Sequence, residues 1–194
     1  MNKKYKVLAL YGKGGAGKDT ILNWIVSNYP YMHEIISCTT RPPRSYEKEG
    51  VNYFFLTKDE FIEKHQSGNM LETAEFNGWY YGTPLSSLKE DKINIGVFNP
   101  DGIMQLLADA RLDVLSIEII AKDKLRIYRM LERDRNADCQ EVCRRFLEDE
   151  KDFYNLYFRD ITFNNSSDRD EFHTIFNLPG AEEWIAAGRK ELNI

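Results

Sequence analysis

The feature that most constrains this chain is an apolar run that ends in a glycine-rich turn and is followed by a second apolar run. Lys6 to Tyr11 is almost entirely apolar, which is typical of a strand buried on both faces of a parallel sheet. Thr20 to Tyr29 has apolar residues at helical spacing, and Pro30 ends the predicted helix. This order of strand, turn and helix predicts an α/β fold with a parallel sheet.

The turn reads Gly12-Lys-Gly-Gly-Ala-Gly-Lys18 and fits the phosphate-binding pattern G-x-x-x-x-G-K. Its glycines let backbone N–H groups curl around phosphate oxygens, and the helix start adds partial positive charge. Lys18 is expected to reach the β and γ phosphates of ATP. The alternative is a flexible glycine turn with a surface lysine, and the position between a strand and a helix argues against it. We expect ATP to contact Gly12, Gly14, Gly15, Ala16, Gly17, Lys18, Asp19 and Thr20.

The residue after the motif lysine is normally Ser or Thr, whose hydroxyl binds Mg²⁺, but here it is Asp19. A carboxylate is a hard oxygen donor and suits Mg²⁺ at least as well as a hydroxyl. We therefore expect Asp19 to bind the metal, directly or through water, and Thr20 to hydrogen-bond a phosphate. The implied cofactor is Mg²⁺, with ATP as the phosphoryl donor.

The rest of the chain alternates between predicted strands and helices, which extends the parallel α/β pattern. Strands are expected at 95–98, 112–121 and 161–163, and a closing helix at 181–192. Residues 34–94 differ in character and are interpreted as an inserted small module with a strand at 52–56 and a short helix. Thr57 and Glu60 are spaced as a capping box at the start of that helix. Residues 125–157 are mostly helical and rich in arginine, a pattern that usually marks a solvated helix face.

Composition and charge exclude several classes of protein. The 194 residues, of which 42% are hydrophobic, suffice for one domain and its core. The formal net charge of −5 argues against a nucleic-acid binder. The three cysteines form no CxxC pair, which fits a reduced cytoplasm, and no long apolar stretch indicates a membrane anchor. We expect a cytoplasmic protein, monomer or homodimer, that binds small molecules rather than nucleic acid or membrane.

Four further motifs follow the glycine turn in order. They are Ser37-Cys-Thr-Thr-Arg41-Pro-Pro-Arg44, Glu49-Gly-Val-Asn-Tyr53-Phe-Phe55, Leu71-Glu72-x-Ala-Glu75 and Tyr80-Tyr81-Gly-Thr83. With these motifs at suitable spacing, the chain from the glycine turn to about Asn164 closely resembles the guanylate kinases. The resemblance implies a P-loop parallel sheet core flanked by helices, an inserted module that binds a nucleoside monophosphate, and a helical lid.

On this resemblance the single domain of residues 1–194 divides into three parts. The core comprises 1–33, 95–125 and 148–194, the acceptor-binding module 34–94, and the lid about 126–147. The implied activity is that of a phosphotransferase of purine nucleotide metabolism, which converts ATP and GMP or dGMP to ADP and GDP or dGDP. Two alternatives stay open: a kinase of another nucleoside monophosphate, and a catalytically inactive member that binds a protein partner. The retained glycine turn and its lysine argue against the inactive member.

The acceptor motifs carry chemistry that supports this interpretation. Two arginines three apart on a proline-stiffened loop can fork onto one phosphate while tyrosine hydroxyls donate to it. By similarity to guanylate kinases, the acceptor phosphate is held by Arg41, Arg44, Tyr53 and Tyr81, and the base is faced by Ser37, Glu72 and Thr83. The Glu72 carboxylate accepts hydrogen bonds from N1–H and the exocyclic N2–H₂ of guanine, whereas adenine has no donors there.

One segment departs from the family pattern. Guanylate kinases usually carry Asp-x-Asp-x-Gln-Gly after the second core strand, and this chain has Val97-Phe-Asn99-Pro-Asp-Gly102. Asn99 keeps an acceptor oxygen that suits the guanine amino group, whereas Val97 cannot bind magnesium, water or base. Our hypothesis is that Asp19 restores the lost carboxylate near the metal from the other side.

The arginine-rich helices fall where guanylate kinases have their lid. Phosphoryl transfer needs alignment and positive charge on the oxygens that carry charge in the transition state. The expected catalytic residues are Lys18, Arg133, Arg135 and Arg145. Arg129 is an alternative to one of the first two arginines, and Arg144 to Arg145. No general base is required, because the acceptor phosphate is already an anionic nucleophile.

Overall fold

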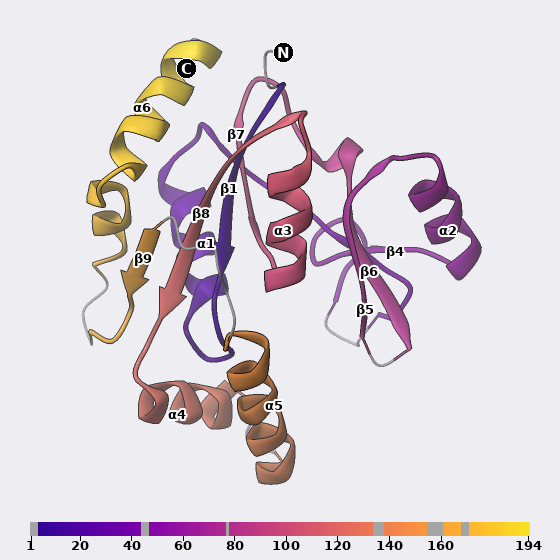
Figure 1. The fold of residues 1–194 in the computed structure, drawn as a ribbon, viewed down its shortest axis with the longest axis vertical. Helices are drawn as coiled ribbons and strands as arrows, with labels where there is room; N and C mark the ends of the chain where they lie inside the picture. Colours follow the sequence, from indigo (N-terminus) through magenta and orange to yellow (C-terminus); the bar gives the residue numbers. More distant parts are fainter. Residues whose placement is uncertain (1–3, 44–46, 77, 134–137, 155–160, 168–170) are drawn as a thin grey trace.

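The computed structural model describes residues 4–43, 47–76, 78–133, 138–154, 161–167 and 171–194. Two sheets lie side by side (Figure 1). The larger has the strand order β2-β7-β1-β8-β9, and the smaller has the order β4-β3-β6-β5. The strands of the larger sheet are β1 (Tyr5–Tyr11), β2 (Met32–Glu34), β7 (Ile93–Val97), β8 (Leu112–Ile120) and β9 (Ile161–Asn164).

The five strands of the larger sheet are parallel, as the sequence pattern predicts. The central strand β1 pairs with β7 on one side and with β8 on the other, so that Leu8 lies opposite both Ile95 and Leu115. Every residue of β1 is buried. Its continuous apolar run therefore reflects a strand covered on both faces.

Helices cover the two faces of this sheet. On one face, Leu8 and Leu10 belong to the same core cluster as Ile21 of α1 (Lys18–Asn28) and Ile185 of α6 (Ala181–Leu192). The short 3₁₀ helix η2 (Phe172–Asn177) completes that layer. On the other face, the core contains Val7 and residues of α3 (Pro100–Ala108). Alternate residues of one strand thus serve two helical layers.

The smaller sheet lies on the far side of α3 from the larger sheet (Figure 1). Its strands are β3 (Cys38–Thr39), β4 (Phe54–Phe55), β5 (Met70–Phe76) and β6 (Trp79–Pro84), followed by the 3₁₀ turn η1 (Leu85–Ser87). Helix α2 (Lys58–Gln66) packs on it through Phe61. The predicted capping box is present, with Thr57 Oγ1 accepting from the Glu60 amide at 3.3 Å and Glu60 Oε2 accepting from the Thr57 amide at 2.7 Å.

Helices α4 (Asp123–Arg133) and α5 (Cys139–Asp152) lie beyond the carboxyl end of β1, beside the loop that joins it to α1 (Figure 1). Within the described ranges, no helix is long and apolar enough to cross a membrane.

Some expected boundaries were wrong. Helix α1 begins at Lys18 rather than Thr20, because the left-handed Gly17 (φ 95°) turns the chain directly into the helix. The strand expected at 52–56 is only the two-residue β4, because the Asn52 side chain accepts from the Lys48 amide and closes a turn. The strand expected at 95–98 is β7, which runs from Ile93 to Val97. The sequence did not locate β2, β5 or β6 individually.

Candidate functional site

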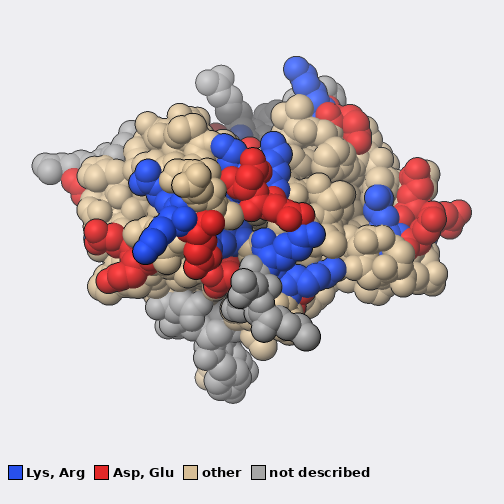
Figure 2. All heavy atoms as spheres, turned by 90° about the horizontal axis from the view of Figure 1, so that it is seen from above, with Lys and Arg blue, Asp and Glu red and all other residues tan. Residues whose placement is uncertain are grey.

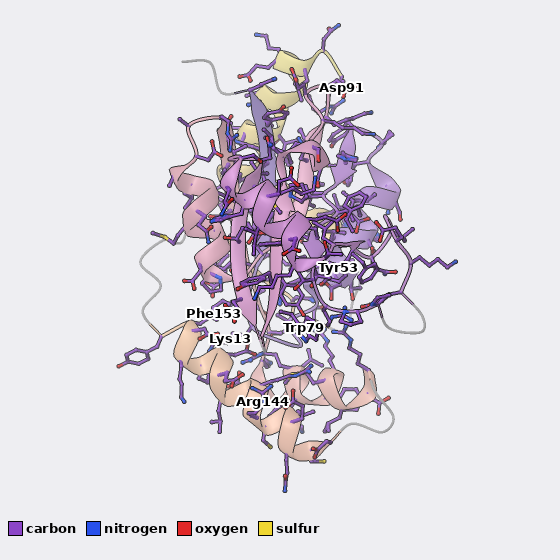
Figure 3. All side chains as sticks on the ribbon, turned by 90° about the vertical axis from the view of Figure 1, so that its right-hand side faces the viewer. Lys13, Tyr53, Trp79, Asp91, Arg144 and Phe153 are labelled. Carbon is purple, nitrogen blue, oxygen red and sulfur yellow. The ribbon has the colours of Figure 1, made fainter. Side chains whose placement is uncertain are left out.

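A cleft of about 1060 Å³ lies between the glycine-rich loop, the smaller sheet and helix α5. In Figure 3, Lys13 and Phe153 lie where α5 meets the end of the sheet, and Asp91 lies at the opposite end. The lining therefore combines residues that are far apart in the sequence. They include Gly12, Gly14, Lys18, Ser37, Tyr53, Glu72, Tyr81, Val97, Asn99, Asp101, Asp149, Asp152 and Phe153.

The glycine-rich loop, residues 12–17, wraps around the end of the Lys18 side chain. Gly15 and Gly17 adopt left-handed backbone angles of 74° and 95°, which glycine reaches without steric cost. The Lys18 ammonium donates to the carbonyl oxygens of Gly12 at 2.7 Å and Lys13 at 3.2 Å. Burial lowers the pKa of Lys18, and the negative charge of Asp19 opposes that shift. The loop thus holds a partly desolvated cation inside the cleft.

Helices α4 and α5 contact this loop through an ion pair that the sequence did not reveal. Arg126 is 1% exposed, so the expectation that the arginine run is a solvated face is wrong at this position. Its Nε donates to Gly14 O at 3.0 Å, and its Nη2 donates to Asp149 Oδ2 at 3.0 Å. The Gly14 amide donates to the same Asp149 oxygen at 2.7 Å. Lys13 and Glu150 form a second ion pair at 2.5 Å. No motif marks Arg126, Asp149 or Glu150, because their contacts with the loop join segments that are distant in the sequence.

On the other side of the cleft, the three residues expected to face the base form one hydrogen-bonded chain. Thr83 Oγ1 donates to Glu72 Oε1 at 2.8 Å and lies 3.1 Å from Ser37 Oγ. Glu72 is 8% exposed. Burial raises its pKa, and the Thr83 hydroxyl partly counters this. A buried carboxylate with one protein donor has acceptor capacity left for a ligand.

The expected phosphate clamp is also assembled in part. The Arg41 guanidinium carbon lies 5.8 Å from the centre of the Tyr53 ring, and, after Glu47, the neighbouring Tyr81 contributes to the raised pKa of Arg41. The Tyr53 and Tyr81 ring centres are 6.2 Å apart. Glu47, which the sequence did not single out, holds Arg41 with bonds of 2.8 and 2.9 Å and raises its pKa. The other predicted clamp residue, Arg44, lies outside the described residues.

Asn99, which replaces a family aspartate, and Asp19, which is expected to compensate for the aspartate lost at Val97, differ in burial and in hydrogen bonding. Asn99 lines the cleft, but its Oδ1 accepts from the Gly102 amide at 2.7 Å and caps α3. Asp19 and Thr20 are exposed at the start of α1. Burial raises the pKa of Glu34, at the end of β2, and the charge of Asp19 raises it further. Sequence reasoning did not mark Glu34.

Among the described residues, no three His, Cys, Asp or Glu side chains gather as a metal site. Mg²⁺ does not need such a cage, because it usually keeps several waters and binds one or two carboxylates together with substrate phosphates. An exposed carboxylate at Asp19, next to the buried ammonium of Lys18, fits that mode of binding.

The arginines expected to belong to a lid differ in what they contact. Arg133 is exposed, yet its charge contributes to the lowered pKa of Lys18. Arg129 donates to Gly15 O at 3.4 Å and to Ala16 O at 3.3 Å. On α5, Arg145 Nε donates to Glu141 at 2.6 Å, and Arg144 bonds Glu141 at 2.6 Å and Glu148 at 2.5 Å. In this structure Arg126 and Arg129 of α4 therefore contact the loop, whereas Arg144 and Arg145 of α5 pair along their own helix. Arg135 lies outside the described residues.

One further contact ties the two halves of the cleft together. The side-chain amide of Gln105 on α3 accepts from the Thr73 amide at 3.0 Å and donates to the Thr73 carbonyl at 3.1 Å. Thr73 follows Glu72 on β5. Gln105 therefore holds β5, the strand that carries Glu72, against helix α3. A glutamine on a predicted helix gives no signal of such a role.

Comparison with known proteins identifies the family. The guanylate kinase family model matches residues 4–174. The chain is 36% identical over 152 residues to a guanylate kinase of Prochlorococcus marinus, covering 76% of this chain and 81% of that protein. It is 34% identical over 169 residues to one of Streptococcus pyogenes, covering 78% and 74%. The crystal structure of guanylate kinase from Anaplasma phagocytophilum shares the fold, with a TM-score of 0.64, 24% identity and coverage of 95% and 87%. The chain belongs to the guanylate kinase family.

Proposed function

We propose that this protein is an ATP-dependent nucleoside monophosphate kinase that phosphorylates GMP or dGMP to the diphosphate. The observation that carries the proposal is the buried chain of Ser37, Thr83 and Glu72 in the same cleft as the glycine-rich loop and Lys18. One half of the cleft offers acceptors for guanine donors, and the other offers donors for phosphate oxygens. A transferase needs both halves to face one space.

On the donor side, the loop acts as a P-loop. Its amides and the start of α1 bind the phosphates of ATP, and Lys18 reaches the β and γ phosphates. Asp19 would hold Mg²⁺, and Thr20 a phosphate oxygen. When bound, the metal neutralises charge on the phosphate oxygens and fixes their orientation. The exposed position of Asp19 beside Lys18 supports this assignment.

On the acceptor side, Glu72 accepts from N1–H and N2–H₂ of guanine, with Ser37 and Thr83 beside it. Arg41 and Arg44 bind the acceptor phosphate together with Tyr53 and Tyr81. Asn99 contacts the guanine amino group through the lone pair that the Gly102 bond leaves unused. An adenine in this position would leave the buried Glu72 carboxylate with only the Thr83 hydroxyl as a donor, which disfavours AMP.

Transfer of the phosphoryl group requires positive charge that stabilises the negative charge on its oxygens in the transition state. Lys18, Arg133, Arg135 and Arg145 supply it, and the contact of Arg129 with the loop supports that residue as a further contributor. Because Arg145 is paired with Glu141 here, it must exchange that partner for a phosphate when the lid closes. Closure of the lid, about 126–147, and of the module, 34–94, over the core would exclude the water that hydrolyses ATP.

The remaining partners follow from the same proposal. On the face shown in Figure 2, described Lys and Arg side chains are interspersed with Asp and Glu. Together with the net charge of −5, this supports nucleotides rather than nucleic acid as ligands. We place the protein in the cytoplasm, as a monomer or homodimer without membrane attachment.

The experiment is a coupled ADP-release assay with ATP, Mg²⁺ and a panel of ribo- and deoxyribonucleoside monophosphates. GMP and dGMP are expected to give the highest kcat/KM. Preference for a non-guanine acceptor would overturn the base assignment while sparing the transfer chemistry. No turnover with any acceptor would overturn the proposed activity and favour a protein-binding module.

A further inference from the structure

The glycine-rich loop is hydrogen-bonded to a carboxylate of the protein itself, that of Asp149. Both backbone groups of Gly14 are held by one ion pair, with Asp149 on the N–H at 2.7 Å and Arg126 on the C=O at 3.0 Å. A third contact at 3.0 Å joins the two side chains. The carboxylate that holds the amide lines the same cleft as Lys18.

This position is chemically unusual for a carboxylate. Loop N–H groups of this type bind phosphate oxygens, and a carboxylate oxygen competes for the same donor. Asp149 and Lys18 line the same cleft, so the carboxylate offsets part of the positive potential that the lysine supplies there. Asp149 therefore takes up the Gly14 N–H donor, and it reduces the positive potential, both of which a polyphosphate needs for binding.

The contact between Asp149 and the Gly14 amide can be broken without leaving a buried charge unpaired. Arg126 keeps two further carboxylate partners, Asp123 at 2.8 Å and Glu150 at 3.2 Å, so losing Asp149 does not strand a buried cation. Asp149 belongs to α5, the helix that also carries Arg145. A movement of α5 that withdraws Asp149 from Gly14 would therefore also change the position of Arg145 relative to the loop.

We propose that Asp149 is an internal competitor of the donor's phosphates and thereby sets the affinity of the loop for polyphosphate. The donor displaces the carboxylate from the Gly14 amide, so part of the binding free energy of ATP is spent on breaking this contact. The inference rests on the proposed function for the identity of the donor. The alternative, in which the ion pair shapes the loop for phosphate, predicts the opposite sign.

The test is titration calorimetry of inorganic tripolyphosphate and of ADP into the protein and two variants. Asp149→Asn keeps the size of the side chain and removes its charge, and Asp149→Ser removes its reach to Gly14. Both are expected to bind tripolyphosphate about ten-fold more tightly than the unaltered protein, since charge-assisted hydrogen bonds are the stronger class. The matched control is Glu148→Gln, which removes one charge from the same helix at a surface pair with Arg144.

Unchanged or weaker binding in both variants would overturn the proposal, as would equal tightening in Glu148→Gln, because that would reflect net charge alone. Thermal unfolding establishes that each variant is folded, and either variant suffices for the comparison. Calorimetry needs no acceptor and no turnover. If the Asp149 variants bind polyphosphate more tightly but the protein turns over no acceptor, only the proposed kinase activity is contradicted. If the protein is an active kinase but the variants do not bind polyphosphate more tightly, only this inference is contradicted.

Discussion

Replacing Glu72 by Gln separates recognition of the acceptor from stability of the fold. In the proposed complex, the carboxylate accepts from two guanine donors, whereas glutamine places an NH₂ group against one of them and removes the charge opposite the other. A hydrogen bond to a charged group contributes roughly 1.5–3 kcal/mol. The expected loss is therefore about 3–4 kcal/mol, or roughly 10²- to 10³-fold in kcat/KM for GMP.

The same change is expected to stabilise the protein without nucleotide. Burial raises the pKa of Glu72 above its ordinary value of 4.5, so the folded state binds the proton more tightly than the unfolded chain. The stability from this group is present below the ordinary pKa and is lost as pH rises through the folded pKa. At pH 7 burial of this titratable carboxyl group is thus a cost, which Gln removes while its carbonyl still accepts from Thr83. A gain of about 1 kcal/mol would raise Tm by roughly 2–4 °C.

Steady-state kinetics with GMP and with inosine monophosphate, which lacks the exocyclic amino group, measures recognition. Circular dichroism melts at pH 7 and pH 4 measure stability, and the difference in Tm is expected to shrink at pH 4. Glu75→Gln is the control, because Glu75 is exposed in the same cleft. A loss of kcat/KM for GMP below ten-fold in Glu72→Gln, or an equal loss in Glu75→Gln, would refute the proposal that Glu72 recognises guanine. A lower Tm at pH 7 would refute the argument about burial.

Lys18→Met is expected to lower kcat at least about 10²-fold in the ADP-release assay, because a cation aimed at the phosphates is lost; a loss below ten-fold would contradict its role. Gln105→Ala is expected to raise the KM for GMP about ten-fold and leave the KM for ATP unchanged, with the exposed Leu107→Ala on the same helix as control; equal changes in both KM values would indicate general loosening. A double-mutant cycle of Asp19→Ser and Val97→Asp, measured over a Mg²⁺ series, is expected to show coupling above about 1 kcal/mol, whereas additivity within about 0.5 kcal/mol would argue against compensation.

The predictions that succeeded rest on local patterns. The apolar run of β1, the glycines of the loop and the capping box at Thr57 each depend on residues within one turn or one strand. Strand ends were less accurate, as β4 shows, because a side chain of Asn52 closed a turn that apolar composition does not reveal. The residues predicted to face the base were named from ordered motifs and lie in one hydrogen-bonded chain, although Ser37 and Thr83 are 46 residues apart.

Other features of the site have no signal in the sequence. The contact of Gly14 with Asp149 spans 135 residues, and that of Gln105 with Thr73 spans 32. Arg126 belongs to a run that looks solvated, and it is buried because α4 packs against the loop it holds. Such contacts depend on where whole helices dock, and no spacing between neighbours encodes that.

Local sequence patterns were enough to predict the parallel α/β core and the glycine loop between β1 and α1, because a tight turn between a buried strand and a helix depends only on neighbouring residues. Tertiary structure alone decided that one of that loop's amides is occupied by Asp149, a side chain carried by α5. The physical reason is that α5 docks beside the loop and brings a carboxylate within 2.7 Å of the Gly14 N–H.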